Sequence, residues 1–182
     1  WLEENPDRTI ELVTNSVLTS DNFIAQAMID MDTAPRLLLT PEMLERWLSG
    51  LKKGEFNPEL VESDAWKKLV NHPRIRIYQT GKLDSVILGG DEHYGKLHAK
   101  FVVIDDYGFV GTTNFDYRSR LFNNEMGFYF KDEELAADLI QVFEVLKSKS
   151  YRWGTNEWLQ MRKTLMSQKG MKASTTRKQR GL

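Results

Sequence analysis

The sequence predicts an α/β protein in which helices flank both faces of a mixed β-sheet. Short stretches of alternating polar and apolar residues are typical of strands, and longer stretches with apolar residues three or four positions apart are typical of amphipathic helices. The two patterns alternate along the chain, which favours a sheet covered by helices. Of the 182 residues, 41% are hydrophobic and 28% are charged, so the chain can bury a core, and a wholly disordered protein is excluded.

The first strand and the first helix are predicted near the N-terminus. Polar and apolar residues alternate over residues 9–14, as in a strand with one buried face, and the strand ends at Asn15. The polar run Ser20-Asp21-Asn22 then supplies an N-cap candidate for the helically spaced apolar residues that begin at Phe23.

Two further helices are predicted from proline positions. Thr40 followed by Pro41 combines a hydroxyl cap with proline at the first helical position, and this helix is expected to end at Gly54. Another helix is expected from residue 58 to residue 73, with proline at both limits. We interpret residues 32–60 as a helical elaboration on the helix–strand framework.

The remaining elements are a group of strands and one long helix. The strongest strand prediction is residues 97–104, and residues 105–108 are expected to form the tight turn of a β-hairpin. Residues 80–95 are predicted to be a loop that borders a site. Other strands are predicted at residues 74–78, 109–110 and 124–130, and an amphipathic helix at residues 133–153.

Composition excludes several classes of protein and site. The most hydrophobic run, residues 101–104, is far shorter than the roughly 20 residues that span a bilayer. The absence of cysteine excludes disulfide scaffolds, thiolate metal sites and cysteine nucleophiles. Three histidines leave little room for a histidine-built metal centre. The chain opens at Trp1 without an initiator methionine or a signal-like segment, so we expect a fragment of a longer protein.

Charge is distributed unevenly along the chain. Residues 158–182 contain seven basic and no acidic residues, which leaves 18 basic against 26 acidic residues in residues 1–157. We therefore predict a catalytic lobe over residues 1–157 and a basic, partly disordered C-terminal tail over residues 158–182. Such a tail favours an anionic partner, either a membrane surface or a nucleic acid. The alternative is a solvated chain end without a partner.

Histidine and lysine stand in an otherwise apolar predicted strand. His98 and Lys100 are two positions apart, so their side chains are expected to leave the same face of the sheet. Burying an ammonium is costly unless it is paired, so Lys100 is expected to reach solvent or to lie in a cleft that takes an anion. The hairpin's return strand leads into Thr112 and Asn114, whose polar groups can donate to phosphate oxygens. Adjacent strands lie about 4.8 Å apart, so these groups are expected to converge.

These residues resemble the signature of the phospholipase D superfamily. His98-Ala-Lys100, four residues and Asp105 are similar to its H-x-K-x4-D motif, and Gly111-Thr112-Thr113-Asn114 is similar to the G-S/T-x-N motif that follows. The match departs from the pattern in two places: five residues rather than six separate Asp105 from Gly111, and threonine replaces the common serine at position 112.

Flanking residues resemble one branch of that superfamily more narrowly. The run from Asn114 to Ser119, N-x-D-x-R-S, precedes a short apolar stretch and the N-x-E of residues 123–125, as in bacterial cardiolipin synthases. Residues 14–16 and 19–22 are similar to that branch's first strand and loop. The resemblance therefore implies a phospholipase D-like half as the fold.

The resemblance also implies a reaction. His98 is expected to be the nucleophile, attacking phosphorus through its neutral Nε2 to form a phosphohistidine, with Glu125 accepting a hydrogen bond from Nδ1. Lys100 and Asn114, together with Thr112, are expected to hold the phosphoryl oxygens as charge develops. No metal or other cofactor is expected, because lysine and asparagine supply the positive field.

Asp105 is part of the signature and is counted among the catalytic residues. Its place before a tight turn suggests that it orients the hairpin rather than touching substrate.

One catalytic group of the family has no counterpart in this chain. The reaction uses the histidine of a second H-x-K motif as the acid that protonates the leaving oxygen. The remaining histidines are His72, which we interpret as a surface or cap residue, and His93, which lies in the loop before the site. The resemblance therefore implies a second lobe, either the N-terminal half of the same protein or a second copy of this chain.

Three functions follow from these observations. The leading hypothesis is a half-site of a phospholipase D-type phosphodiesterase or phosphatidyltransferase that acts on phospholipids, in the bacterial cytoplasm and peripheral to the inner membrane. The first alternative is a metal-independent endonuclease that works as a homodimer. The second alternative is a lobe without activity of its own that supports a partner lobe.

Overall fold

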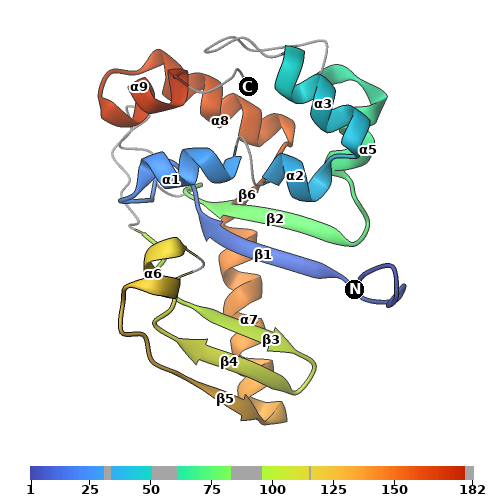
Figure 1. Cartoon of the computed structure of the whole chain (residues 1–182), viewed down its shortest axis with the longest axis vertical. Coiled ribbons are helices and arrows are strands. Elements are labelled where there is room, and N and C mark those ends of the chain that lie inside the picture. The colour runs from blue at the N-terminus through green and yellow to red at the C-terminus, as the bar shows by residue number, and fades with distance from the viewer. Residues whose placement is uncertain (31–33, 51–60, 83–95, 115, 179–182) are drawn as a thin grey trace. The chain divides into compact units, whose positions relative to one another are not determined.

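The computed structural model divides the chain into two compact units (Figure 1). The larger unit comprises residues 1–96 and 149–182, and the smaller unit comprises residues 97–148. The predicted α/β class, with a mixed sheet and flanking helices, is confirmed, and the strands are divided between two three-stranded sheets. The structure describes residues 1–30, 34–50, 61–82, 96–114 and 116–178.

The larger unit contains the mixed sheet. Strand β1 (Ile10–Asn15) pairs in parallel with β2 (Ile75–Thr80), and β2 pairs antiparallel with the short β6 (Ser150–Arg152). The described helices of this unit are α1 (Phe23–Met28), α2 (Ala34–Leu38), α3 (Pro41–Gly50), α5 (Asp64–Val70), α8 (Asn156–Ser167) and α9 (Met171–Arg177).

Three tryptophans lie at the centre of the larger unit's core. Trp153 packs between Trp66 and Trp158, with ring centroids 5.3 Å apart in both pairs. All three side chains are almost completely buried, and Trp66 donates from its indole nitrogen to the Gly154 carbonyl at 3.0 Å. These residues come from α5, the segment after β6 and α8, so the core joins parts of the chain that are distant in sequence.

Two of the predicted helix starts, those after Asn22 and Thr40, are confirmed. Asn22 Oδ1 accepts a hydrogen bond from the Ala25 amide at 3.2 Å at the start of α1. Thr40 Oγ1 accepts from the Met43 amide at 3.4 Å before α3, which begins at proline as expected. The described part of the predicted elaboration at residues 32–60 is helical, whereas the predicted helix end at residue 54 and helix start at residue 58 lie outside the described residues.

The C-terminal region differs from the predicted tail. Residues 158–178 are largely helical in α8 and α9, and five of their apolar side chains are part of the buried core: Trp158, Leu159, Met161, Leu165 and Ala173. The division at residue 157 is thus not a structural boundary, because α8 runs through it. The region is basic, but its apolar residues also have amphipathic helical spacing, and this spacing buries one face of α8.

The smaller unit is an antiparallel sheet with two helices. Its strands are β3 (Phe101–Ile104), β4 (Tyr107–Gly111) and β5 (Gly127–Lys131), in the order β3-β4-β5. The short α6 (Tyr117–Leu121) lies between β4 and β5 in the chain, and the long α7 (Glu133–Ser148) lies against β3 and β4. Among the described residues, no helix combines the length and the apolar composition needed to cross a membrane.

Helix α7 is shorter than the sequence predicts. The amphipathic pattern suggested a helix to residue 153, but α7 ends at Ser148 and residues 150–152 form β6. Tyr151 pairs with Gln79 of β2, so sheet hydrogen bonds replace helical ones at this point. Tertiary pairing therefore overrides a local pattern that is compatible with both structures.

Candidate active site

His98 and Lys100 precede the hairpin strand instead of lying on it. The predicted strand at residues 97–104 is correct only from Phe101 onward. The Gly111 amide still donates to the Lys100 carbonyl at 3.0 Å, but the next amide, that of Thr112, donates to the Met126 carbonyl of the β5 side at 2.8 Å. The ladder between β3 and β4 therefore ends at Lys100, which leaves His98 in an irregular, exposed segment.

The Lys100 side chain is joined to the backbone of His98 by a hydrogen bond. Lys100 Nζ donates to the His98 carbonyl oxygen at 2.9 Å, so the ammonium folds back over its own segment. An ammonium has three donors. Within the described part of the chain Lys100 makes no other side-chain hydrogen bond, so two of its donors remain for an anion.

Glu125 is held as a carboxylate by its neighbours. Thr112 Oγ1 donates to Oε2 at 2.6 Å, and Asn123 Nδ2 donates to Oε1 at 3.0 Å. Hydrogen bonding by Thr112, then by Ser119 and Asn123, lowers the pKa of Glu125, and the positive charge of Lys100 adds a smaller effect. Among the described residues no hydrogen bond joins Glu125 to His98, so the expected contact with Nδ1 is not formed in this structure.

In this structure the Thr112 hydroxyl is hydrogen-bonded to the Glu125 carboxylate. The hydroxyl donates to Glu125 and accepts a hydrogen bond from the Met126 amide at 3.0 Å. A hydroxyl has one proton, so Thr112 has no second donor for a phosphate while it holds Glu125. The arrangement thus assigns to Thr112 the orientation of Glu125, where the sequence had suggested a phosphate contact.

Replacing Thr112 with valine is expected to raise the pKa of Glu125, because the hydrogen bond that most favours the ionised form is lost. The lowered pKa in the folded protein means that this bond stabilises the fold at neutral pH and ceases to do so as the pH falls through that pKa. An NMR titration of the Glu125 side-chain carboxyl measures the change. Thr113→Val removes a hydroxyl one position further on and should leave the titration curve unchanged; equal curves for both variants would contradict the assignment.

Asn114 is fixed through its backbone by the start of α6. Its amide donates to Ser119 Oγ at 3.2 Å, and the Ser119 amide donates to Asp116 Oδ1 at 2.8 Å, which makes Asp116 the N-cap of that helix. The Asn114 side chain is exposed at the same end of the smaller unit as Thr112. It is therefore available to an incoming anion.

Ser119 and Asn123 also act on Glu125, a role that the sequence did not predict. Ser119 is buried, and both residues lower the pKa of Glu125. Both stand in the stretches that resemble the cardiolipin synthase branch, N-x-D-x-R-S and N-x-E. The motif spacing was the available signal, but only the fold of α6 onto the end of β4 reveals what these side chains do.

Asp105 lies at the opposite end of the hairpin from His98. It adopts a positive φ of 57° in the turn between Ile104 and Tyr107, a conformation that aspartate tolerates better than most residues. The four residues of β3 separate it from Lys100, a path of about 13 Å at about 3.3 Å per residue. This placement agrees with a role in shaping the hairpin rather than in contacting substrate at His98.

The segment that carries His98 is tied at its other end to the loop after β1. Lys96 Nζ lies 2.6 Å from Asp21 Oδ2, and the Lys96 ammonium lowers the pKa of Asp21. The loop is itself anchored, because Thr19 Oγ1 lies 2.9 Å from Thr80 Oγ1 at the end of β2 and Lys172 of α9 donates to the Leu18 carbonyl. Lys96, two residues before His98 in the chain, is therefore held within the larger unit by this ion pair.

The other histidines do not form a second catalytic centre in the part of the chain described. His72 Nδ1 accepts hydrogen bonds from the Arg74 and Ile75 amides at 3.1 and 3.0 Å, which confirms its interpretation as a structural cap residue. His93 lies outside the described residues. Across the described ranges, no group of three or more histidine, aspartate or glutamate side chains is placed to hold a metal ion.

Comparison with known families agrees with the residues found at this site. The chain matches the family described as cardiolipin synthase, PLD-like domain, over residues 7–147, a range that includes every predicted site residue. The chain belongs to this phospholipase D-like family. The match extends from just before β1 to the last turn of α7, so this PLD-like domain takes strands from both units. No curated protein and no solved structure matches the chain.

Proposed function

We propose that this PLD-like domain is a catalytic lobe of a phosphodiesterase or phosphatidyltransferase that acts on phospholipids through a phosphohistidine. The main support is the group formed by His98 and the Lys100 ammonium, which is bonded to the His98 carbonyl, at the end of the smaller unit that also carries the ionised Glu125. A nucleophile next to a cation with unused donors is suited to attack on a phosphodiester.

The proposed reaction has two steps. His98 Nε2 attacks phosphorus, the N–P bond forms, and the bond to the leaving oxygen breaks with its electron pair on that oxygen. Lys100 and Asn114 stabilise the charge that develops on the phosphoryl oxygens. Water or an alcohol then attacks the phosphohistidine: an O–P bond forms, the N–P bond breaks with its electron pair on Nε2 of His98, and the second lobe's histidine accepts the proton of the attacking oxygen. Because leaving alkoxides need a proton, a second lobe with its own H-x-K histidine supplies the acid.

Attachment to an anionic membrane is proposed through the C-terminal basic residues, but by fewer of them than the composition suggested. Arg162 is fully buried against Asp30, and Arg177 donates to carbonyls at the end of α8. The exposed basic residues in the described C-terminal region include Lys163, Lys169 and Lys178. Each lysine near an anionic surface contributes about 1 kcal/mol, so these three support peripheral, reversible binding.

The direct test is phospholipid turnover by the chain together with a second H-x-K lobe. Vesicles of phosphatidylglycerol are incubated with the protein, with and without an added alcohol, and the products are separated by chromatography. Transfer of the phosphatidyl group, or its hydrolysis, is the expected result. Failure to convert phospholipid under either condition would reject the lipid substrate, and cleavage of DNA or RNA by the same preparation would support the nuclease alternative.

Breaking the tie between Asp21 and Lys96 is expected to slow the formation of phosphohistidine by about two- to fivefold, the range set by an exposed ion pair. Asp21→Asn and Lys96→Met should have equal effects that do not add in the double variant, because both remove one interaction. The measurement is the single-turnover rate at low and high salt. If Lys96→Met alone weakened substrate binding, Lys96 would be a substrate contact and not a tether.

A further inference from the structure

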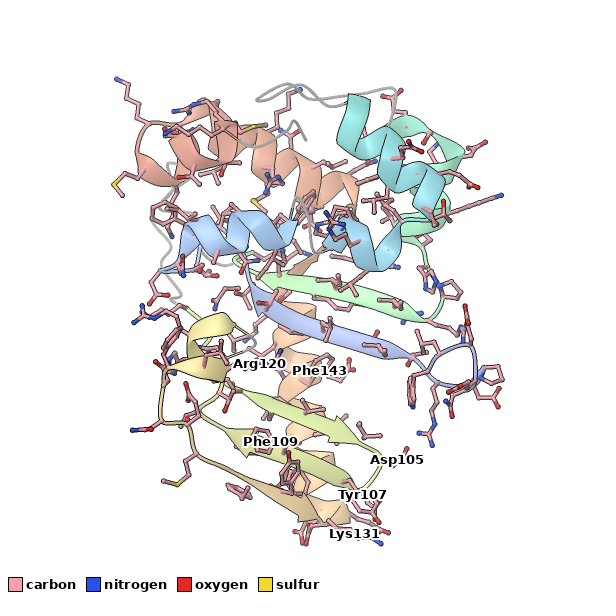
Figure 2. All side chains as sticks on the ribbon, viewed as in Figure 1. Asp105, Tyr107, Phe109, Arg120, Lys131 and Phe143 are labelled. Carbon is pink, nitrogen blue, oxygen red and sulfur yellow. The ribbon has the colours of Figure 1, made fainter. Side chains whose placement is uncertain are left out.

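The sheet of the smaller unit has an apolar face where a polar one is normally found. In the antiparallel register Val102, Phe109 and Tyr129 lie opposite one another, and Ile104 lies opposite Tyr107 on the same face. Lys131 lies opposite Tyr107 at the turn end of this face, with its ammonium 4.9 Å from the centroid of the Tyr107 ring. We call the five residues other than Lys131 the apolar strip. In Figure 2, Tyr107 and Phe109 mark its course along β4, and α7 lies behind the sheet.

All strip residues except Phe109 are exposed, whereas most of the residues that alternate with them on β3 and β4 are partly buried; Phe128 of β5, on the other face, is also exposed. Ile104 and Tyr107 are 55% and 54% exposed, and Tyr129 is 85% exposed. Phe101 and Val103, which point to the other face, are partly buried, consistent with α7 lying against β3 and β4. An antiparallel sheet with one packed face usually carries polar residues on the other, so this face is suited to an apolar ligand.

Two glycines extend the strip toward the catalytic end of the hairpin. A Cβ atom at Gly127 would lie 2.3 Å from the Phe109 ring, and one at Gly111 would lie 2.7 Å from it. The Phe109 ring therefore lies along the sheet over both glycines, and it also packs against Tyr129 with centroids 4.9 Å apart. Any larger residue at either glycine position would displace this ring.

A cation stands where the strip meets the proposed site. Lys100 lies opposite Gly111, since its carbonyl accepts the Gly111 amide, and it precedes Val102 and Ile104 at two-residue spacing. Although Lys100 precedes β3, its bond with Gly111 continues the ladder by one residue, which places its Cα–Cβ bond on the strip's side. A positive group at the end of an apolar surface about 13 Å long is complementary to a molecule that joins a phosphate to a hydrocarbon chain.

We propose that the apolar strip binds an acyl chain of the phospholipid whose phosphate is held at His98 and Lys100. This inference rests on the proposed function and specifies how that site would select an acylated phosphodiester. The aromatic rings supply area for a flexible chain, and the distance from Lys100 to Ile104 sets the length of chain that contacts the sheet.

The test compares two substrates with the same leaving group. One is a p-nitrophenyl ester of a diacyl phosphatidic acid, and the other is a p-nitrophenyl phosphodiester without acyl chains. Nitrophenolate leaves with its electron pair and needs no proton from a second lobe, so release by the full chain reports attack by His98. For the triple variant Val102→Thr, Ile104→Thr and Tyr129→Thr, the ratio of acylated to acyl-free rates is expected to fall at least about tenfold.

Threonine retains strand propensity, and three exposed apolar residues of α7 provide a control. Ile140, Val142 and Val145 are 46%, 48% and 47% exposed, and their replacement by threonine should leave the ratio unchanged. A second measurement needs no variant: the wild-type rate should rise with acyl length until the strip is covered. A ratio unaffected by the strip variant, a flat length series, or loss of a dimer without a change in ratio would overturn the inference. Wild-type protein that releases nitrophenolate from neither substrate would overturn the proposed function itself.

Discussion

The variant His98→Asn is expected to form no phosphohistidine and to lose on the order of 10⁴-fold in turnover. Asparagine is close to the imidazole in size but has no nucleophilic nitrogen, so the first step has no acceptor for the phosphoryl group. His98 is exposed and makes no side-chain hydrogen bond among the described residues, so its replacement should leave the fold intact. Mass spectrometry of the trapped phosphoenzyme and steady-state turnover provide the two measurements.

A matched histidine provides the control for this experiment. In the variant His72→Asn the amide oxygen can still accept from the Arg74 and Ile75 amides, so turnover should stay close to that of the wild type. Full activity of His98→Asn would exclude His98 as the nucleophile. Wild-type protein with a partner lobe that never traps phosphate on His98 would favour the hypothesis of a non-catalytic supporting lobe.

The second large effect is expected in the core of the larger unit, where a charged pair is completely buried. Arg162 of α8 donates to Asp30 Oδ2 at 2.8 Å, and both side chains have no solvent exposure. Gln79 of β2 also donates to Asp30 and accepts from the Trp158 indole at 2.6 Å. Burial raises the pKa of Asp30, and the positive charge of Arg162 opposes that shift.

Asp30→Ala is expected to lower the free energy of unfolding by about 3–5 kcal/mol, because the guanidinium of Arg162 would remain buried without its carboxylate. Urea unfolding followed by tryptophan fluorescence measures the loss. The double variant Asp30→Leu with Arg162→Met removes both charges and should recover most of it.

An exposed pair offers the contrast for this prediction. Asp64 and Lys67 lie 4.0 Å apart on α5 with most of both side chains in solvent, so Asp64→Ala should change stability by less than about 1 kcal/mol. Similar losses for Asp30→Ala and Asp64→Ala would show that the buried pair does not stabilise the larger unit.

Sequence reasoning succeeded where the signal was local. The caps at Asn22 and Thr40 and the existence of the hairpin turn depend on side chains and dihedral angles within a few residues of each other. The turn is shorter than the predicted residues 105–108, because Tyr107 and Gly108 already pair with β3. Sequence reasoning failed where a strand or helix was decided by a distant partner. Residues 150–152 pair with β2 instead of extending α7. Residues 97–100 lie before the strand, since the Thr112 amide donates to the Met126 carbonyl and not to this segment.

The basic C-terminal region illustrates the limit of composition. Its charge was read correctly, but net charge does not distinguish a solvated arginine from Arg162, which lies at the centre of the larger unit. The distinction depends on Asp30, which is 132 positions away in the chain. A pairing over that separation leaves no trace in the spacing of either residue.

By itself the sequence determined the class of fold, the family and the residue types of the candidate site, because motif spacing and hydrophobic period are properties of the chain. Only the tertiary structure decided that Thr112 and Asn123 hold Glu125, that Lys100 bends back to His98, and that one face of the hairpin sheet is left apolar and exposed. Those features depend on which side chains and backbone groups come into contact across strands and turns. Hydrogen-bond partners are set by position in space and not by order along the chain.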